Sequence, residues 1–290
     1  MKQIIISSIN RFFTKLLYLF GVLKNRWCLG VIDENFKIKK IIIPPKGFFW
    51  ADPFYIKYKN KNYIFFESYS YSRKKGEIAC GELKNNNIVN FKIILKKRYH
   101  LSYPFIFKYK NNYFMIPETF QEKKLQIFKC IKFPFKWTLY STAFKNLSLV
   151  DTTIIKIKKN IWLFTNQMKK DTVEFNKNLY LYKINNLKFT KIVPHSKNPI
   201  ISSFNGGRNA GSIFQIGNKF IRPSQINKKN NYGYGLKLSV IEKIGLNQYK
   251  EKQLKKITPK ERGITGIHHI SKINNKNYLV DICLSYSRNI

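Results

Sequence analysis

The amino-acid sequence predicts an all-β protein, and three observations support that class. Strand-favouring Ile, Phe and Tyr are abundant, whereas Ala and Leu are comparatively scarce, and 44% of the 290 residues are hydrophobic. A hairpin pattern of two apolar runs around a polar turn recurs along the chain at a spacing of about fifty residues. No Gly/Ser-rich linker divides the sequence, and helical spacing is confined to its N-terminal segment.

The clearest copy of the hairpin pattern is Phe48 to Glu67, which reads FFWADPFYIKYKNKNYIFFE. Two strand-like apolar runs flank the polar turn at residues 59–62. Antiparallel strands place the start of the first beside the end of the second. We therefore expect the carboxylates of Asp52 and Glu67 at the same end of this hairpin.

Four further copies of this pattern follow, namely Tyr103 to Thr119, Asp151 to Asn166, Asn209 to Gln225, and Gly266 to Ile282. Outer hairpins lie between the copies, so each unit offers about four strands, and closing five units into a ring removes exposed sheet edges. The spacing therefore predicts a five-bladed β-propeller, in which the early strand Trp27 to Ile32 completes the last blade. A two-sheet sandwich is the alternative, and regular recurrence of one hairpin type argues against it.

The N-terminal segment, residues 1–26, is predicted to be a short amphipathic helical segment, and residues 27–290 are predicted to form the propeller. Arg11 and Lys15 interrupt its apolar stretch, and no small-residue cleavage site follows, so we expect no signal peptide. No run of eighteen apolar residues predicts a transmembrane helix. The segment either lies on a membrane surface or covers the body of the domain. We expect a cytoplasmic protein, membrane-peripheral under the first interpretation.

The formal net charge of +39 has two interpretations. A nucleic-acid or anionic-membrane binder would concentrate basic residues on one surface, and nucleic-acid readers typically cluster Arg with aromatic residues. Here lysines occupy nearly every turn, which is typical of a solvated surface, so we expect no nucleic-acid partner. The excess charge still favours acidic partners such as phosphorylated sugars or anionic lipids.

The four cysteines lie far apart in apolar contexts and form no C-x-x-C pair. Metal-ligand spacing is therefore absent, and buried free thiols in a reducing compartment are expected. We expect neither a metal site nor a cofactor.

Equivalent positions of propeller blades converge at one mouth of the central channel, so the ends of the inner strands predict the site. The first-strand positions are Asp52, Tyr103, Asp151, Arg208 with Asn209, and His268 with His269. The second-strand positions are Glu67, Glu118, Asn166, Arg222 with Gln225, and Asp281. Only 15 residues are Asp or Glu, and five of them fall in these two rings, which indicates a site rather than chance placement.

Converging carboxylates suit acid/base chemistry on a glycosidic bond, where one group donates a proton and another, ionised, activates water. Arginines and histidines at the same mouth would hold hydroxyl, carboxylate or phosphate groups. The alternative for Asp52 and Asp151 is a structural cap of their own turns, and Glu67 and Asp281 could be partners of Arg or His.

An ordered series of motifs also resembles the N-terminal, bacterial-type domain of plant glucosamine inositolphosphorylceramide transferases, a domain that also occurs in bacterial proteins. The motifs are Trp50-Ala51-Asp52-Pro53-Phe54, Tyr103-Pro104-Phe105, Ile116-Pro117-Glu118-Thr119, Asp151-Thr152-Thr153-Ile154, Pro194-His195-Ser196, Arg208-Asn209-Ala210-Gly211, and Tyr232-Gly233-Tyr234-Gly235 with Ile267-His268-His269.

The resemblance implies a five-bladed propeller related to arabinanase, xylosidase and invertase folds. In those enzymes an Asp in an A-D-P opening is the base and a later Asp tunes the acid; Asp52 and Asp151 match these positions. Their acid is a Glu in an E-G-P context, which this sequence lacks, so Glu118 is our candidate acid. Predicted substrate-binding residues are Glu67, Tyr103, Arg208, Arg222, His268 and His269.

The sequence thus predicts a carbohydrate-active protein with one funnel site, either glycoside hydrolase-like or associated with a glycosyltransferase, in cell-surface glycan or glycolipid metabolism. The alternative is a non-catalytic module that binds a glycan or sugar nucleotide. As partners we expect a sugar or glycoconjugate and, as the resemblance implies, a glycosyltransferase or formyltransferase.

Overall fold

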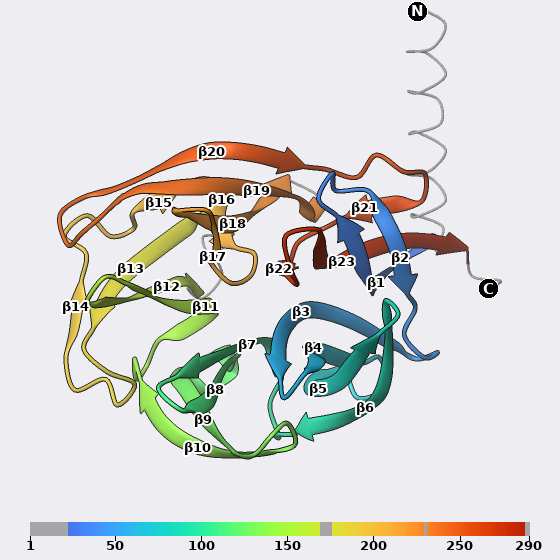
Figure 1. Cartoon of the computed structure of the whole chain (residues 1–290), viewed down its shortest axis with the longest axis horizontal. Coiled ribbons are helices and arrows are strands. Elements are labelled where there is room, and N and C mark those ends of the chain that lie inside the picture. Colours follow the sequence, from blue (N-terminus) through green and yellow to red (C-terminus); the bar gives the residue numbers. More distant parts are fainter. Residues whose placement is uncertain (1–22, 169–175, 229–230, 288–290) are drawn as a thin grey trace, which may run out of the picture.

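The computed structural model describes residues 23–168, 176–228 and 231–287, which form five antiparallel β-sheets around a central axis (Figure 1). Each sheet is one blade of a five-bladed β-propeller, so the predicted fold is confirmed. The predicted amphipathic helix lies almost wholly in residues 1–22, outside the described residues. Within the described ranges, no helix is long and apolar enough to cross a membrane.

Blades 1 and 2 each contain four consecutive strands that run outward from the axis. Blade 1 consists of β3 (Phe48–Tyr58), β4 (Lys61–Ser70), β5 (Lys75–Lys84) and β6 (Asn87–Leu95). Blade 2 consists of β7 (Ser102–Tyr109), β8 (Asn112–Glu118), β9 (Leu125–Lys132) and β10 (Lys136–Ala143), with the 3₁₀ helix η1 (Phe120–Glu122) after β8.

Blades 3 and 4 keep this order and add one short strand each. Blade 3 consists of β11 (Ser148–Ile157), β12 (Asn160–Met168), β13 (Asn178–Ile184) and β14 (Ile192–Pro194), with β15 (Ile201–Ser202) beside β13. Blade 4 consists of β16 (Asn205–Asn209), β18 (Lys219–Lys228), β19 (Asn231–Ile244) and β20 (Tyr249–Ile257), with β17 (Phe214–Ile216) beside β18.

Blade 5 joins the two ends of the chain. The C-terminal strands β21 (Ile264–Gly266), β22 (Ile270–Lys272) and β23 (Asn277–Ser287) supply its inner part, and β1 (Leu23–Asp33) and β2 (Ile38–Ile42) supply its outer part. β1 pairs with β23 along its whole length. The prediction that the strand around residues 27–32 completes the last blade is confirmed, and that strand begins at Leu23 rather than Trp27.

Each sheet is buried on both faces, which explains why the inner strands read as continuous apolar runs. In β4, Ile64, Phe65 and Phe66 are all fully buried. Successive side chains point to opposite faces, so Phe65 packs in the cluster shared with blade 2, while Ile64 and Phe66 pack against blade 5. Each such side chain contributes about 1.5–3 kcal/mol through burial.

The polar turns of the repeat have the backbone that two-residue hairpins require. Lys59 and Asn60 adopt φ of 43° and 60°, and Asn85 and Asn86 adopt 48° and 59°. Two successive residues with positive φ characterise the type I′ turn, and asparagine tolerates this conformation well. The recurring Lys-Asn turns therefore set the hairpins that bring the inner strand ends to one mouth.

Candidate functional site

Three inner strands carry the same backbone irregularity at the same position. Asp52, Tyr103 and Asp151 adopt φ of 52°, 44° and 48°, and the pairing of each strand with its neighbour shifts there. Non-glycine residues with positive φ are uncommon, and bulges of this kind re-aim side chains and backbone amides. The predicted strand openings are therefore bulges inside longer strands.

Side-chain oxygens accept hydrogen bonds from the backbone amides at these three bulges and at Asn209, and each bond links two neighbouring blades. The four hydrogen bonds are from Asp52 N–H to Asp281 Oδ2 (3.0 Å), Tyr103 N–H to Asp52 Oδ2 (3.1 Å), Asp151 N–H to Glu118 Oε2 (3.3 Å) and Asn209 N–H to Asn166 Oδ1 (3.0 Å). Buried acceptors need such donors, since an unpaired buried polar group is costly. The two predicted rings therefore meet at one mouth.

A pocket of about 200 Å³ opens at this mouth, and we call it the funnel pocket. Ligand pockets for drug-sized molecules are typically about 300–1,000 Å³, so this pocket suits one small group such as a single sugar ring. Among the residues that line it are six of the nine predicted site residues, namely Asp52, Glu67, Glu118, Asp151, Arg208 and His268.

Asp52 is a buried carboxylate with two histidines beside it. Its Oδ1 lies 3.4 Å from Nδ1 of His269 and 3.6 Å from Nε2 of His268. Burial alone would raise the pKa of Asp52, but the hydrogen bond from His269 and the charge of His268 outweigh burial and hold this pKa below its usual range. Asp52 is therefore ionised at neutral pH.

His268 is the cationic member of this group. Its Nδ1 lies 2.8 Å from Oδ2 of Asp281, whose Oδ1 accepts the backbone amides of both His268 and His269. Burial opposes protonation, but the charge and hydrogen bond of Asp281 raise the pKa of His268 above its usual value. Asp52, His268 and Asp281 also offer three ligand atoms within 4.8 Å of one another, and they are the residues here that could hold a cation.

Glu118 and Asp151 form a second carboxylate pair on the pocket wall. The Arg208 Nε donates to Asp151 Oδ2 at 2.5 Å, and the guanidinium lies over the Tyr232 ring. Burial and the charge of Asp151 raise the pKa of Glu118 well above its usual range, against the opposing charge of Arg208. A hydrogen bond between the two carboxyl groups adds to this effect. The raised pKa of Glu118 favours its protonated form beside the ion-paired Asp151.

Glu67 is the fourth carboxyl group of the pocket and is 5% exposed. Its Oε1 accepts no hydrogen bond from the described residues, and the imidazole Nε2 of His100 lies 3.5 Å from it. Burial and the charge of Asp52 raise the pKa of Glu67 well above its usual range. The pocket therefore brings together two glutamates with a raised pKa and one aspartate, Asp52, with a lowered pKa.

Three predicted substrate-binding residues lie behind the pocket wall. Tyr103 is 1% exposed, and its hydroxyl bridges the backbone of Gly211. His269 is fully buried against Phe54 and Tyr103. These two residues support the site from beneath rather than line it.

Arg222, the third, is fully buried within blade 4. Its Nε and Nη2 reach both oxygens of Glu251 at 2.7 Å and 2.9 Å, and Nη2 also donates to the Gly206 carbonyl. These contacts occupy the guanidinium in a structural ion pair, so its position does not favour the predicted role in substrate binding.

A family comparison identifies relatives of this chain. The family model described as "Glucosamine inositolphosphorylceramide transferase 1, N-terminal" matches residues 41–268. The chain belongs to this family. Glucosamine inositolphosphorylceramide transferase 1 of Oryza sativa subsp. japonica is 32% identical over 207 residues, and that of Arabidopsis thaliana is 31% identical over 208. Each match covers 70% of this chain and 27% of the plant protein, so the chain spans about a quarter of these relatives.

Solved glycosidase structures share the family domain's fold. The α-L-arabinofuranosidase from Lactobacillus brevis superposes with a TM-score of 0.60 at 15% identity, covering 86% of this chain and 88% of that one. The catalytic domain of the GH62 α-L-arabinofuranosidase from Coprinopsis cinerea gives 0.57 at 11% identity, covering 83% and 94%. At these identities the similarity establishes the propeller fold alone.

Among the residues that line the funnel pocket in this family member, five with aromatic rings were not predicted from the sequence, namely Trp27, Phe49, Tyr69, His100 and Tyr232. Trp27 lies 4.2 Å from the His268 ring, and Phe49 stacks on Tyr69 at 4.5 Å. Aromatic faces next to polar groups are typical of sugar sites. One signal was present: His100 closely precedes the second copy of the repeat.

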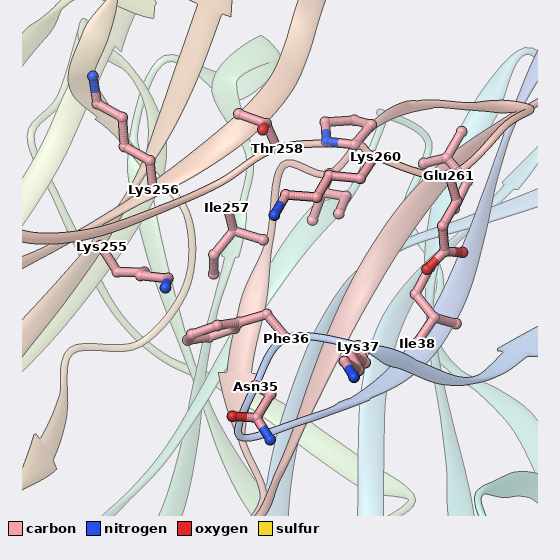
Figure 2. A pocket seen from close by; sticks show the side chains of 13 residues that line it. Asn35, Phe36, Lys37, Ile38, Lys255, Lys256, Ile257, Thr258, Lys260 and Glu261 are labelled. Atoms are coloured by element: carbon pink, nitrogen blue, oxygen red, sulfur yellow. The ribbon is translucent and has the colours of Figure 1, made fainter.

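A second pocket of about 240 Å³ lies on the outer rim between blades 4 and 5, and we call it the lysine pocket (Figure 2). The turn after β1 and the segment after β20 form it. In the view of Figure 2, Ile257 lies between the side chains of Lys255 and Lys260, and the Phe36 ring lies below them. The four lysines that line it, Lys37, Lys255, Lys256 and Lys260, are all exposed.

Proposed function

We propose that this domain acts on one sugar of a glycan or glycoconjugate by glycosidase-like acid/base chemistry in the funnel pocket. A carbohydrate-related role is consistent with both comparisons, since the plant relatives are named glucosamine inositolphosphorylceramide transferases and the structural neighbours include α-L-arabinofuranosidases. The transferase activity of the whole plant proteins is a separate matter, because this chain spans 27% of them.

The observation that carries the proposal is the opposite direction of the pKa shifts inside one small pocket. The pKa of Asp52 is lowered, whereas the pKa values of Glu67 and Glu118 are raised. Titratable groups whose environments push their pKa values apart are typical of acid/base pairs. Glycoside hydrolysis needs such a pair, with one carboxylate ionised and one carboxyl group protonated.

In the proposed reaction Asp52 takes a proton from a water molecule whose oxygen forms a bond to the anomeric carbon. The bond between that carbon and the leaving oxygen breaks, and a protonated glutamate of the pocket transfers its proton to the leaving oxygen. Asp151, ion-paired with Arg208, keeps negative charge beside Glu118 and thereby tunes the acid. Solvent then restores both protonation states.

A panel of 4-nitrophenyl glycosides tests the proposal, with arabinofuranoside, galactoside, glucosaminide and N-acetylglucosaminide as first members. We expect nitrophenol release from at least one of them, and a loss of about 10²–10⁴-fold in kcat/KM for Asp52→Asn. Lys256→Asn in the lysine pocket is the matched control and should retain full activity. An active Asp52→Asn variant would exclude Asp52 as the base.

The alternative is a non-catalytic sugar-binding module that serves a transferase partner. One observation favours it: both oxygens of Asp52 and the Oδ2 of Asp151 already have protein partners, namely the Tyr103 N–H, the two histidines and Arg208. Thermal shift against sugar nucleotides and lipid-linked sugars detects such binding, because a ligand of the native state raises apparent stability. Binding that survives in Asp52→Asn, with no turnover in the parent protein, would support the module.

A further inference from the structure

Four blades place a polar side chain at the equivalent point of the second strand of their inner hairpin. Three of these four side chains accept a hydrogen bond from a backbone amide of the next blade. Glu67, Glu118 and Asn166 pair with the residue that precedes the bulge of their own blade. Asp281 takes this place in blade 5, because it binds the amides of His268 and His269.

Three of these side chains hold the bulge of the next blade. Asp281 accepts a hydrogen bond from the Asp52 amide. In the same way Glu118 accepts one from the Asp151 amide, and Asn166 accepts one from the Asn209 amide. A carboxylate or amide oxygen in this role makes a structural hydrogen bond between two blades, and its loss would leave a buried amide unpaired.

Glu67 accepts no hydrogen bond from the next blade, because Asp52 accepts that bond instead. The amide in the next blade is that of Tyr103, and it donates to Asp52 Oδ2 at 3.1 Å rather than to Glu67. Among the described residues none donates a hydrogen bond to Glu67 Oε1, although this atom is shielded from solvent. The carboxyl group thus lines the pocket without a structural bond.

The surroundings of Glu67 nevertheless hold it in place. A Cβ added at Gly76 would come within 2.5 Å of Glu67 Oε1 and would also meet the Leu101 carbonyl, so glycine makes the space for the carboxyl group. His100 Nδ1 accepts the Gly76 amide at 3.0 Å, so the ring proton of a neutral His100 sits on Nε2, which faces Glu67 at 3.5 Å. His100 in turn donates its backbone amide to Gln121.

We propose that Glu67, rather than Glu118, is the proton donor of the funnel pocket. This inference depends on the proposed function. The Glu67 carboxyl proton passes to the leaving oxygen as its bond to the anomeric carbon breaks, while Asp52 takes the proton of the attacking water. Glu118 keeps its own proton in the hydrogen bond with Asp151, and its Oε2 holds the Asp151 amide. Glu118 is then a positioning residue.

Leaving-group dependence tests this assignment with the same substitution at two equivalent positions. The wild-type protein and its Glu67→Gln and Glu118→Gln variants are assayed on the sugar that the panel identifies, as the methyl and the 2,4-dinitrophenyl glycoside. A methyl leaving group needs a proton and the dinitrophenyl group does not. We expect Glu67→Gln to lose about 10²–10⁴-fold on the methyl glycoside and about tenfold or less on the other.

Glu67→Gln should also abolish the alkaline limb of the pH profile of kcat/KM, because the profile reports the essential acid. Glu67→Asp, which keeps a carboxyl group, should show the same leaving-group pattern with a smaller loss and serves if the glutamine variant does not fold. Equal losses on both glycosides, or a leaving-group-dependent loss in Glu118→Gln, would overturn the inference. An inactive wild-type protein would instead overturn the proposed function.

Discussion

The funnel pocket and the lysine pocket have similar volumes, but the charged side chains of the first are buried and paired, whereas those of the second are exposed. In the funnel, Asp52, Asp151 and Arg208 are each less than a tenth exposed, and each has a charged partner within 3.6 Å. The lysines of the outer pocket are exposed, and solvent can screen them. The net charge of +39 therefore says little about the site, because the scarce acidic residues, rather than the abundant lysines, form the buried network.

The largest expected effect comes from breaking the buried ion pair. Arg208→Met leaves Asp151 buried without its cation, and removing one partner of such a pair typically costs about 3–5 kcal/mol. Urea unfolding measures the free energy, and Lys255→Met in the lysine pocket is the matched control, with a change within about 0.5 kcal/mol. Equal effects of the two substitutions would remove the contrast between the pockets.

A smaller effect is expected where a glycine makes room for a carboxyl group. Gly76→Ala forces its Cβ against Glu67 and the Leu101 carbonyl, and overpacking of this kind typically costs about 1–3 kcal/mol. We expect a lowered thermal midpoint together with reduced turnover, because Glu67 must move. Gly245→Ala is the control, because its φ lies outside the left-handed region and the added carbon would meet only atoms of Gln248, at 3.2 Å or more. A variant as stable and active as the parent would mean that Glu67 has other room.

The fold was predictable because its signals are local. Two-residue turns such as Lys59-Asn60 and the aromatic second strands repeat visibly in the sequence. The ion pair of Arg222, in contrast, could not be predicted from local signals. Its direction follows from its register in β18, and a shift of one residue exchanges the two faces of a strand. Its partner Glu251 lies two strands further out, and no residue near Arg222 in the sequence indicates that pairing.

Glu67 shows the same limit at the site. Its place beside Asp52 follows from antiparallel pairing and was predicted. That Glu67 accepts no backbone amide of the next blade was not predicted, because this depends on the bulge that turns Asp52 toward the amide of Tyr103. No single residue type marks this positive φ in the sequence, since Tyr103 adopts it as well as the two aspartates Asp52 and Asp151.

The pH dependence of stability distinguishes Glu67 from a surface glutamate. A carboxyl group whose folded pKa is raised binds its proton more tightly in the native state, so stability falls as pH rises from the unfolded pKa of about 4.3 toward the raised value. Glu67→Gln removes this loss, so we expect the variant to be more stable than the parent at pH 8 and to differ little from it at pH 4. Thermal unfolding at pH 4 and pH 8 measures the difference. Glu122→Gln on the surface should change little at either pH, and a Glu67 variant that behaves identically would mean that Glu67 is ionised and paired.

The smallest effect is expected in the lysine pocket itself. Lys255→Ser combined with Lys260→Ser removes two ammonium groups that no described carboxylate binds within 4 Å. Exposed substitutions usually change stability within about 0.5 kcal/mol, and the funnel pocket keeps every contact described above. Unfolding by urea and turnover of the best glycoside at physiological salt should both match the parent protein. A loss of turnover of about tenfold or more would show that the outer lysines reach the substrate, and the acidic funnel would then be only part of the binding site.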